Sequence, residues 1–147
     1  MGIRNFGVLP AAAIGFAPAN PRDLPWATVL HPTSGAVVAV FSIHGPPVFG
    51  ATTVAGVCAW DNAQIGQINV LAGGGGWVCL GDFNVDPTGL APPYVAPPAG
   101  NVVRGNHATQ QGGGLLDYAV TTAGTLAYVA QGQLAGASDH YPQTFSC

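Results

Sequence analysis

Trp77-Val-Cys-Leu-Gly-Asp-Phe-Asn84 joins an apolar run directly to polar side chains. Four glycines precede it, and a short apolar run bounded by turn residues is typical of a buried strand over 77–80. If the strand continues, Asp82 and Asn84 point to the same side of it. Their oxygen atoms are of the kind that Mg²⁺ accepts in proteins. The same two residues are also common turn formers, so both interpretations stay open.

Two strand-like runs and one helix-like run precede this stretch. Residues 26–30 and the β-branched run 36–43 flank the turn-forming residues 32–35, which predicts a hairpin. Apolar residues recur at mostly helical spacing from Thr53 to Leu71, so we predict one amphipathic helix there.

The rest of the chain predicts a loop and more strands. Residues 87–105 are dense in Pro and Gly and are expected to be loop. Residues 115–120 and 125–129 are expected to pair around 121–124, and 143–146 form a last short strand. This order favours an α/β or α+β layered domain with a mixed sheet.

Composition limits the kind of protein. The 147 residues are 48% hydrophobic, which suffices for one domain with one core, but only 6% are charged. All six acids are Asp and all three strong bases are Arg, so the chain holds neither Glu nor Lys. A net charge of -3 argues against strong non-specific binding to nucleic acid, which depends on Lys and Arg.

The cysteines and the N-terminal residues allow alternatives. Cys58, Cys79 and Cys147 are too widely spaced to indicate a disulfide framework or a zinc site. Buried thiols are favoured, and a bridge from Cys58 to Cys79 is the alternative for a secreted protein. Residues 1–20 fit either a secretory signal or a pair of strands, and no apolar stretch reaches the ~18 residues needed to span a membrane.

Three more polar residues are candidates for the same site. Asp139 and His140 are adjacent, and His140 can carry a proton near neutral pH. With Asp82 and Asn84 they suit metal-assisted hydrolysis of a phosphate ester. Taken singly, Asp139 and His140 could be a surface pair, and His44 an ordinary loop histidine.

Four ordered blocks carry a family resemblance. They are F-S-I-H-G-P-P (41–47), W-V-C-L-G-D-F-N-V-D-P (77–87), G-G-G-L-L-D-Y-A-V (112–120) and A-S-D-H-Y-P (137–142). Together they resemble the signature blocks of the DNase I-like endonuclease/exonuclease/phosphatase superfamily. The third block, with the preceding T-Q-Q, is particularly similar to the B subunits of cytolethal distending toxins.

The resemblance implies the C-terminal half of a four-layer α/β sandwich and Mg²⁺-dependent hydrolysis of phosphate esters. His44 would contact the scissile phosphate, Asp82 would orient the attacking water and Asn84 would hold the phosphate. Asp139 would lie near the metal, and His140 would act as general acid/base or phosphate ligand. Asp117 would accept a hydrogen bond from His140 and fix its tautomer.

The chain also departs from the family pattern. The superfamily's first half supplies an Asn and a metal-binding Glu, and the whole domain is longer. We therefore expect residues 1–147 to form a single, incomplete domain, with the motifs in 36–147 and residues 1–25 unassigned. Its inner sheet face should stay open, which predicts poor solubility or oligomers.

Three functions remain open on this basis. The first is a nuclease-like phosphodiesterase acting on DNA, with companion toxin subunits as partners. The second is a phosphatase acting on small phosphate esters or phosphoinositides, which the low Arg content favours slightly. The third is a non-catalytic binding module. The likeness to toxins favours secretion, with a cytoplasmic location if the N-terminus is no signal.

Overall fold

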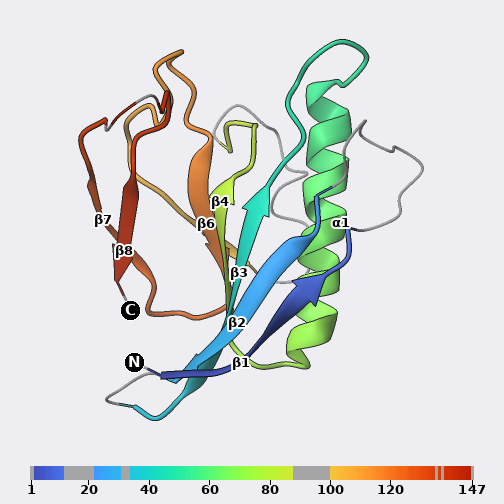
Figure 1. Cartoon of the computed structure of the whole chain (residues 1–147), viewed down its shortest axis with the longest axis vertical. Helices are drawn as coiled ribbons and strands as arrows, with labels where there is room; N and C mark the ends of the chain where they lie inside the picture. The colour runs from blue at the N-terminus through green and yellow to red at the C-terminus, as the bar shows by residue number, and fades with distance from the viewer. Residues whose placement is uncertain are drawn as a thin grey trace.

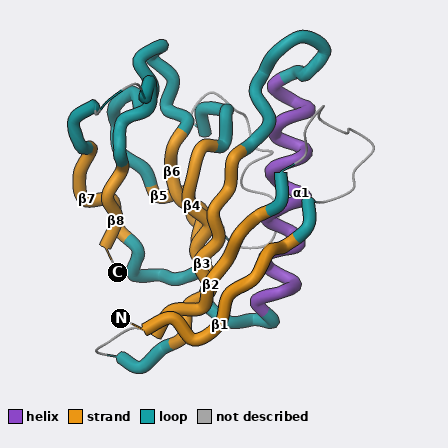
Figure 2. Tube along the Cα trace, viewed as in Figure 1, coloured by secondary structure: helices purple, strands orange, loops and turns teal. Residues whose placement is uncertain are grey.

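The computed structural model describes residues 2–11, 22–30, 34–87, 100–134, 136 and 138–146. Within these ranges one mixed sheet has the strand order β1-β2-β3-β4-β6-β5, and β7 and β8 form a second, two-stranded sheet. Figure 1 shows the helix α1 beside the larger sheet, and Figure 2 shows loops that join the strands. The elements are β1 Gly2–Leu9, β2 Leu24–Leu30, β3 Val37–His44, α1 Val54–Ala72, β4 Trp77–Asp82, β5 Asn101–Val103, β6 Asp117–Thr121, β7 Ala127–Gln131 and β8 Gln143–Ser146.

A β-α-β unit organises the sheet. Strands β3 and β4 are parallel neighbours, so the chain must cross over between them, and α1 makes this connection. The Thr53 side chain caps the start of α1 by accepting a hydrogen bond from the Gly56 N–H at 3.1 Å. Gly73 ends the helix in the left-handed conformation with φ 58°. The predicted helix and the strands on either side of it are confirmed.

The core lies between α1 and one face of the larger sheet. Alternate strand residues, including Phe41, Ile43, Trp77 and Cys79, face α1 and are almost fully buried. From the helix, the apolar residues Val57, Cys58, Trp60, Ile65 and Ile68 pack against them. Both Cys58 and Cys79 are free thiols in this core, so the alternative of a bridge between them is wrong. Cys147 lies outside the described residues.

The opposite face of the sheet borders an apolar groove. Alternation along β3 and β4 places Val38, Val40, Val78 and Leu80 on this face. Phe145 of β8 lines the other wall of the groove, whose cavity volume is about 760 Å³. Val38, Val40 and Leu80 are half-buried in this groove and Val78 is buried, so the expectation that the inner face stays open remains a prediction.

Two predictions about strands are wrong. Residues 115–120 and 125–129 do not pair, because β6 pairs with β4 and β5 while β7 pairs with β8. The Thr121 hydroxyl donates to the Trp77 carbonyl at 2.7 Å and so holds the end of β6 against β4 instead of starting a tight hairpin. The predicted loop 87–105 contains the short strand β5, and residues 88–99 of that loop lie outside the described ones.

The N-terminal residues form a strand where the structure describes them. Strand β1 pairs antiparallel with β2 at the edge of the sheet. Residues 12–21 lie outside the described ranges, so the secretory signal stays a prediction. No helix of the described chain is long and apolar enough to cross a bilayer.

The open groove predicts self-association. We expect the purified chain to form oligomers and to bind a hydrophobic dye, because association would remove the apolar lining of the groove from water. A double variant, Val38→Thr with Val40→Thr, keeps β-branched side chains and should shift the chain toward monomer in light scattering after gel filtration. Val70→Thr on α1, where the side chain is 80% exposed, is the control and should leave the oligomers unchanged. A single monomeric peak for the unaltered chain would contradict this prediction.

Candidate functional site

Three site residues lie in one row across the sheet. The parallel register of β3 and β4 pairs His44 with Asp82, and the antiparallel register of β4 and β6 pairs Asp82 with Asp117. Paired residues point to the same face, so all three side chains share the open side of the sheet. Gly81 makes this approach possible, since it adopts φ 147° and any Cβ there would collide with the Ile43 carbonyl oxygen. The structure thus brings together residues that are up to 73 positions apart in the sequence.

A turn anchored on Asp82 follows β4. The Asn84 backbone N–H donates to Asp82 Oδ1 at 2.8 Å, and Asn84 itself adopts the left-handed conformation with φ 56°. Its side-chain amide donates to Asp82 Oδ2 at 3.1 Å and to the Gly45 carbonyl at 2.8 Å. The interpretation of this pair as turn residues is therefore confirmed, and the turn places both beside the end of β3, whereas binding of Mg²⁺ by their oxygen atoms stays a prediction.

This geometry bears on the predicted role of Asn84. Both hydrogens of its amide are engaged by Gly45 and Asp82, so its free polar atom is the acceptor Oδ1. A phosphate oxygen needs a donor. The predicted phosphate contact of Asn84 would therefore require the amide to turn.

His44 has a partner that the sequence patterns did not reveal. Arg22, just before β2, hydrogen bonds through its guanidinium to His44 Nδ1. An Arg can only donate, so Nδ1 accepts and the proton of the neutral ring resides on Nε2. That Nε2 lies 3.7 Å from Asp82 Oδ2, and the His44 side chain is 49% exposed. Since no motif surrounds Arg22, only the pairing of β2 with β3 places it here.

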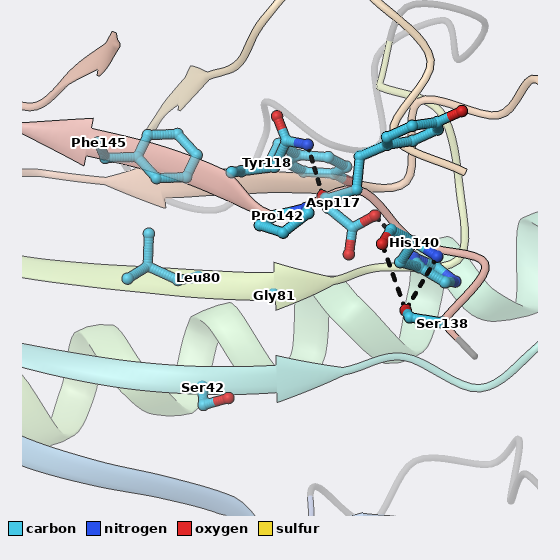
Figure 3. Close-up of a pocket in the computed structure, with 11 residues that line it drawn as sticks. Ser42, Leu80, Gly81, Asp117, Tyr118, Ser138, His140, Pro142 and Phe145 are labelled. Carbon is cyan, nitrogen blue, oxygen red and sulfur yellow. Dashed lines mark hydrogen bonds and ion pairs between the residues drawn. The ribbon is translucent and has the colours of Figure 1, made fainter. Parts of the chain in front are cut away.

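His140 and Asp117 form the closest ion pair of the site. His140 Nδ1 lies 2.8 Å from Asp117 Oδ2, and a carboxylate can only accept, so the imidazole donates. The other nitrogen of His140, Nε2, lies 3.9 Å from Asp82 Oδ2. Figure 3 shows His140 beside Asp117. The predicted partnership of these two residues has the geometry that fixes a tautomer, while its catalytic role stays a prediction.

The pKa values of His44 and His140 are shifted in opposite directions. Burial and the positive charge of Arg22 lower the pKa of His44 below 6.5, although Asp82 opposes them. Burial also lowers the pKa of His140, but the hydrogen bond and charge of Asp117 outweigh it, with help from Asp82, so the net shift is upward. A lowered pKa favours the neutral form of His44, and a raised pKa favours the protonated form of His140. Two such histidines beside one carboxylate can take different roles in acid–base chemistry.

A cation would fit on the two carboxylates. Ligand atoms of Asp82, Asp117 and His140 lie within 4.8 Å of one another in the described chain. Burial raises the pKa of Asp82, and the negative charge of the nearby Asp117 raises it further. A bound cation would therefore reduce the repulsion between the two carboxylates. Oxygen donors suit Mg²⁺, so the carboxylates of Asp82 and Asp117 are the groups of this cluster that would hold it.

Asp139, the residue predicted to lie near the metal, sits at the margin of this cluster. Its side chain is 64% exposed, and its Oδ1 lies 3.9 Å from His140 Nε2. Its Oδ2 accepts a hydrogen bond from the Gln110 amide at 3.3 Å. The role of Asp139 as a metal ligand stays a prediction.

A cavity of about 450 Å³ adjoins His140 and Asp117. Leu80, Pro142 and Phe145 give it apolar walls, as Figure 3 shows. Asp117 and His140 therefore lie at the edge of a space that is open enough to admit a small group.

Replacing Asp117 tests the origin of the upward pKa shift. Asp117→Asn keeps the side-chain shape but removes the charge, so the pKa of His140 should fall in an NMR titration of the histidine ring protons. Because the folded-state pKa of His140 lies above its unfolded value, the pair stabilises the fold below pH 6.5, and this contribution is lost as the pH rises through the folded-state pKa. Thermal melts of Asp117→Asn should lack this pH dependence.

Asp23→Asn is the matched control for this experiment. Asp23 accepts a hydrogen bond from the Ala11 N–H at 3.0 Å and has no contact with His140. The control should leave the His140 titration as it is. If Asp117→Asn also left it unchanged, the pair would not exist in solution.

Comparison with known proteins places this arrangement in a family. The model of the endonuclease/exonuclease/phosphatase family matches residues 9–140, whereas no curated protein sequence matches the chain. Among solved structures, the Haemophilus ducreyi cytolethal distending toxin is similar with 17% identity and a TM-score of 0.62, over 99% of this chain and 58% of that one. A Bacteroides thetaiotaomicron mannosyl-6-phosphatase gives 14% identity and 0.70, over 99% and 66%. The human Nocturnin catalytic domain with bound sulfate gives 15% identity and 0.65, over 99% and 60%.

The similar structures confirm the expected α/β fold, and the family match confirms the superfamily expected from the sequence. The chain spans 58% to 66% of the length of the three similar structures. The family match covers nearly the whole chain, including all four signature blocks except the last two residues of the fourth. The chain therefore belongs to the endonuclease/exonuclease/phosphatase family.

Proposed function

We propose that this chain carries the phosphate-ester hydrolysis site of a metal-dependent, nuclease-like phosphodiesterase. The observation that supports this most is the placement of two histidines with opposite pKa shifts on either side of Asp82. Hydrolysis of a phosphodiester needs a hydrogen-bond donor to the phosphate and a group that moves a proton. His44 and His140 match these two needs.

Each residue then has a distinct task. His44 donates from Nε2 to a phosphate oxygen, while Arg22 holds its ring through Nδ1 and adds positive charge. His140 moves a proton at Nε2, and Asp117 stabilises the imidazolium through Nδ1. Asp82 lies between the two rings and orients the attacking water. A bound Mg²⁺ on Asp82 and Asp117 would supply charge neutralisation for the phosphate.

The charge of the chain supports a second candidate, a phosphatase acting on small phosphate esters. The net charge is -3 and there are three Arg and no Lys, whereas tight binding along DNA depends on many cationic contacts. A small ester needs only the one phosphate contact that Arg22 and His44 provide. A mannosyl-6-phosphatase is among the similar folds.

An assay on both substrate classes tests the proposal. The purified chain is incubated with supercoiled plasmid and, separately, with a chromogenic phosphate monoester, with Mg²⁺ or with excess EDTA. We expect plasmid nicking that needs Mg²⁺, and we expect His140→Ala to slow it by about 100-fold or more, the usual contribution of a general acid or base.

The exposed His107 gives the matched control, because it is a histidine that no contact ties to the row of site residues. His107→Ala should nick plasmid as fast as the unaltered chain. Equal nicking by the unaltered chain and by His140→Ala would refute the role of His140. Hydrolysis of the monoester without any nicking would favour the phosphatase.

A further inference from the structure

Thr109 is a buried polar residue and the first residue of the T-Q-Q stretch that directly precedes the third signature block. It is 1% exposed and lies eight residues before Asp117, on the segment between β5 and β6. Its hydroxyl oxygen accepts from the backbone N–H of Leu116 at 2.8 Å and from that of Asp117 at 2.9 Å. One side-chain oxygen therefore binds the backbone at Asp117, the first residue of β6.

The backbone of the same segment holds the other member of the pair. The Thr109 carbonyl accepts from the Tyr141 N–H at 2.8 Å, and the Asp139 carbonyl accepts from the Gln111 N–H at 2.9 Å. Gln110 forms an antiparallel bridge with His140 between these two bonds. The residues on both sides of His140 are thus tied to the segment that Thr109 begins.

We propose that Thr109 is a positioning residue that fixes the distance between Asp117 and His140. Its hydroxyl holds the Asp117 backbone, and its carbonyl holds the His140 segment, although the two partners are 23 positions apart in the sequence. The catalytic consequence of this inference rests on the proposed function, whereas the geometric part does not.

The hydroxyl alone can be removed. Thr109→Val has nearly the same shape but no acceptor, so the N–H groups of Leu116 and Asp117 lose their partner and the strand end can shift. Thr109→Ser retains the oxygen and is the rescue variant. Since a misplacement of about 1 Å can cost roughly 100-fold in rate, Thr109→Val should lower kcat by about that factor with little change in KM.

Thr121 provides a control for general loss of stability. It lies at the other end of β6, is 2% exposed, and makes comparable hydrogen bonds, donating to the Trp77 carbonyl at 2.7 Å and accepting from the Ala123 N–H at 2.8 Å. Thr121→Val should therefore lower the melting temperature about as much as Thr109→Val. It should leave kcat unchanged.

A spectroscopic measurement separates this inference from the proposed function. In protein with ¹⁵N-labelled histidine, the imidazole Nδ1–H of His140 should give a slowly exchanging downfield signal, identified by its loss in His140→Gln. We expect the signal in the unaltered chain, in Thr109→Ser and in Thr121→Val, and its loss in Thr109→Val. If the unaltered chain has no hydrolase activity but this pattern holds, the function fails and the positioning role stands.

Two results would overturn the inference. One is an unchanged His140 signal, or an unchanged kcat in an active chain, for a folded Thr109→Val. The other applies even if that variant does not fold: the amide hydrogen of Asp117 in the unaltered chain should be protected from exchange with solvent. Exchange as fast as in an unfolded peptide would show that the Thr109 hydroxyl does not hold it.

Discussion

The register of β4 between its two neighbours is the constraint on which the site depends. β4 is parallel to β3 on one side and antiparallel to β6 on the other, and these two registers align His44, Asp82 and Asp117. A slip of β4 by one residue would turn Asp82 toward α1, into an apolar core. The β3-α1-β4 crossover and the Trp77 contacts set this register, because Trp77 starts β4 fully buried and its ring N–H donates to Asn69 of α1 at 3.2 Å.

The sequence predicted the elements whose signals are local. The helix over 54–72 has a capping Thr before it and glycines after it, and the apolar run at 77–80 is closed by glycines on one side and polar residues on the other. Strand β5 was missed, and strand β6 was predicted but given the wrong partner, for a physical reason. Asn101–Val103 is three residues long and becomes a strand only by pairing with β6, and the turn after β6 is shaped by the distant carbonyl of Trp77.

For the site, the sequence supplied the residues but not their distances. The signature blocks predicted His44, Asp82, Asn84, Asp117 and His140, and the structure brings all five to one end of the sheet. Arg22 escaped because it acts through a contact across 22 residues, which no motif records. Thr109 stands in the T-Q-Q stretch before the third block, but the resemblance assigned it no role.

The open groove and the site are two parts of one surface. The residues that alternate with the core along β3 run from Val38 and Val40 in the groove to His44 in the row of site residues. The apolar groove and the polar site therefore lie on the same face of the sheet in this chain, which spans at most 66% of the three similar structures described above.

The most direct test of the central row is the effect of Asp82 on both histidines at once. The negative charge of Asp82 raises the pKa of His44 and that of His140, so Asp82→Asn should lower both in an NMR pH titration of the folded chain. A fall in both pKa values is the result that the shared register predicts. If neither histidine responds, Asp82 does not lie between them, and the arrangement of the site is wrong.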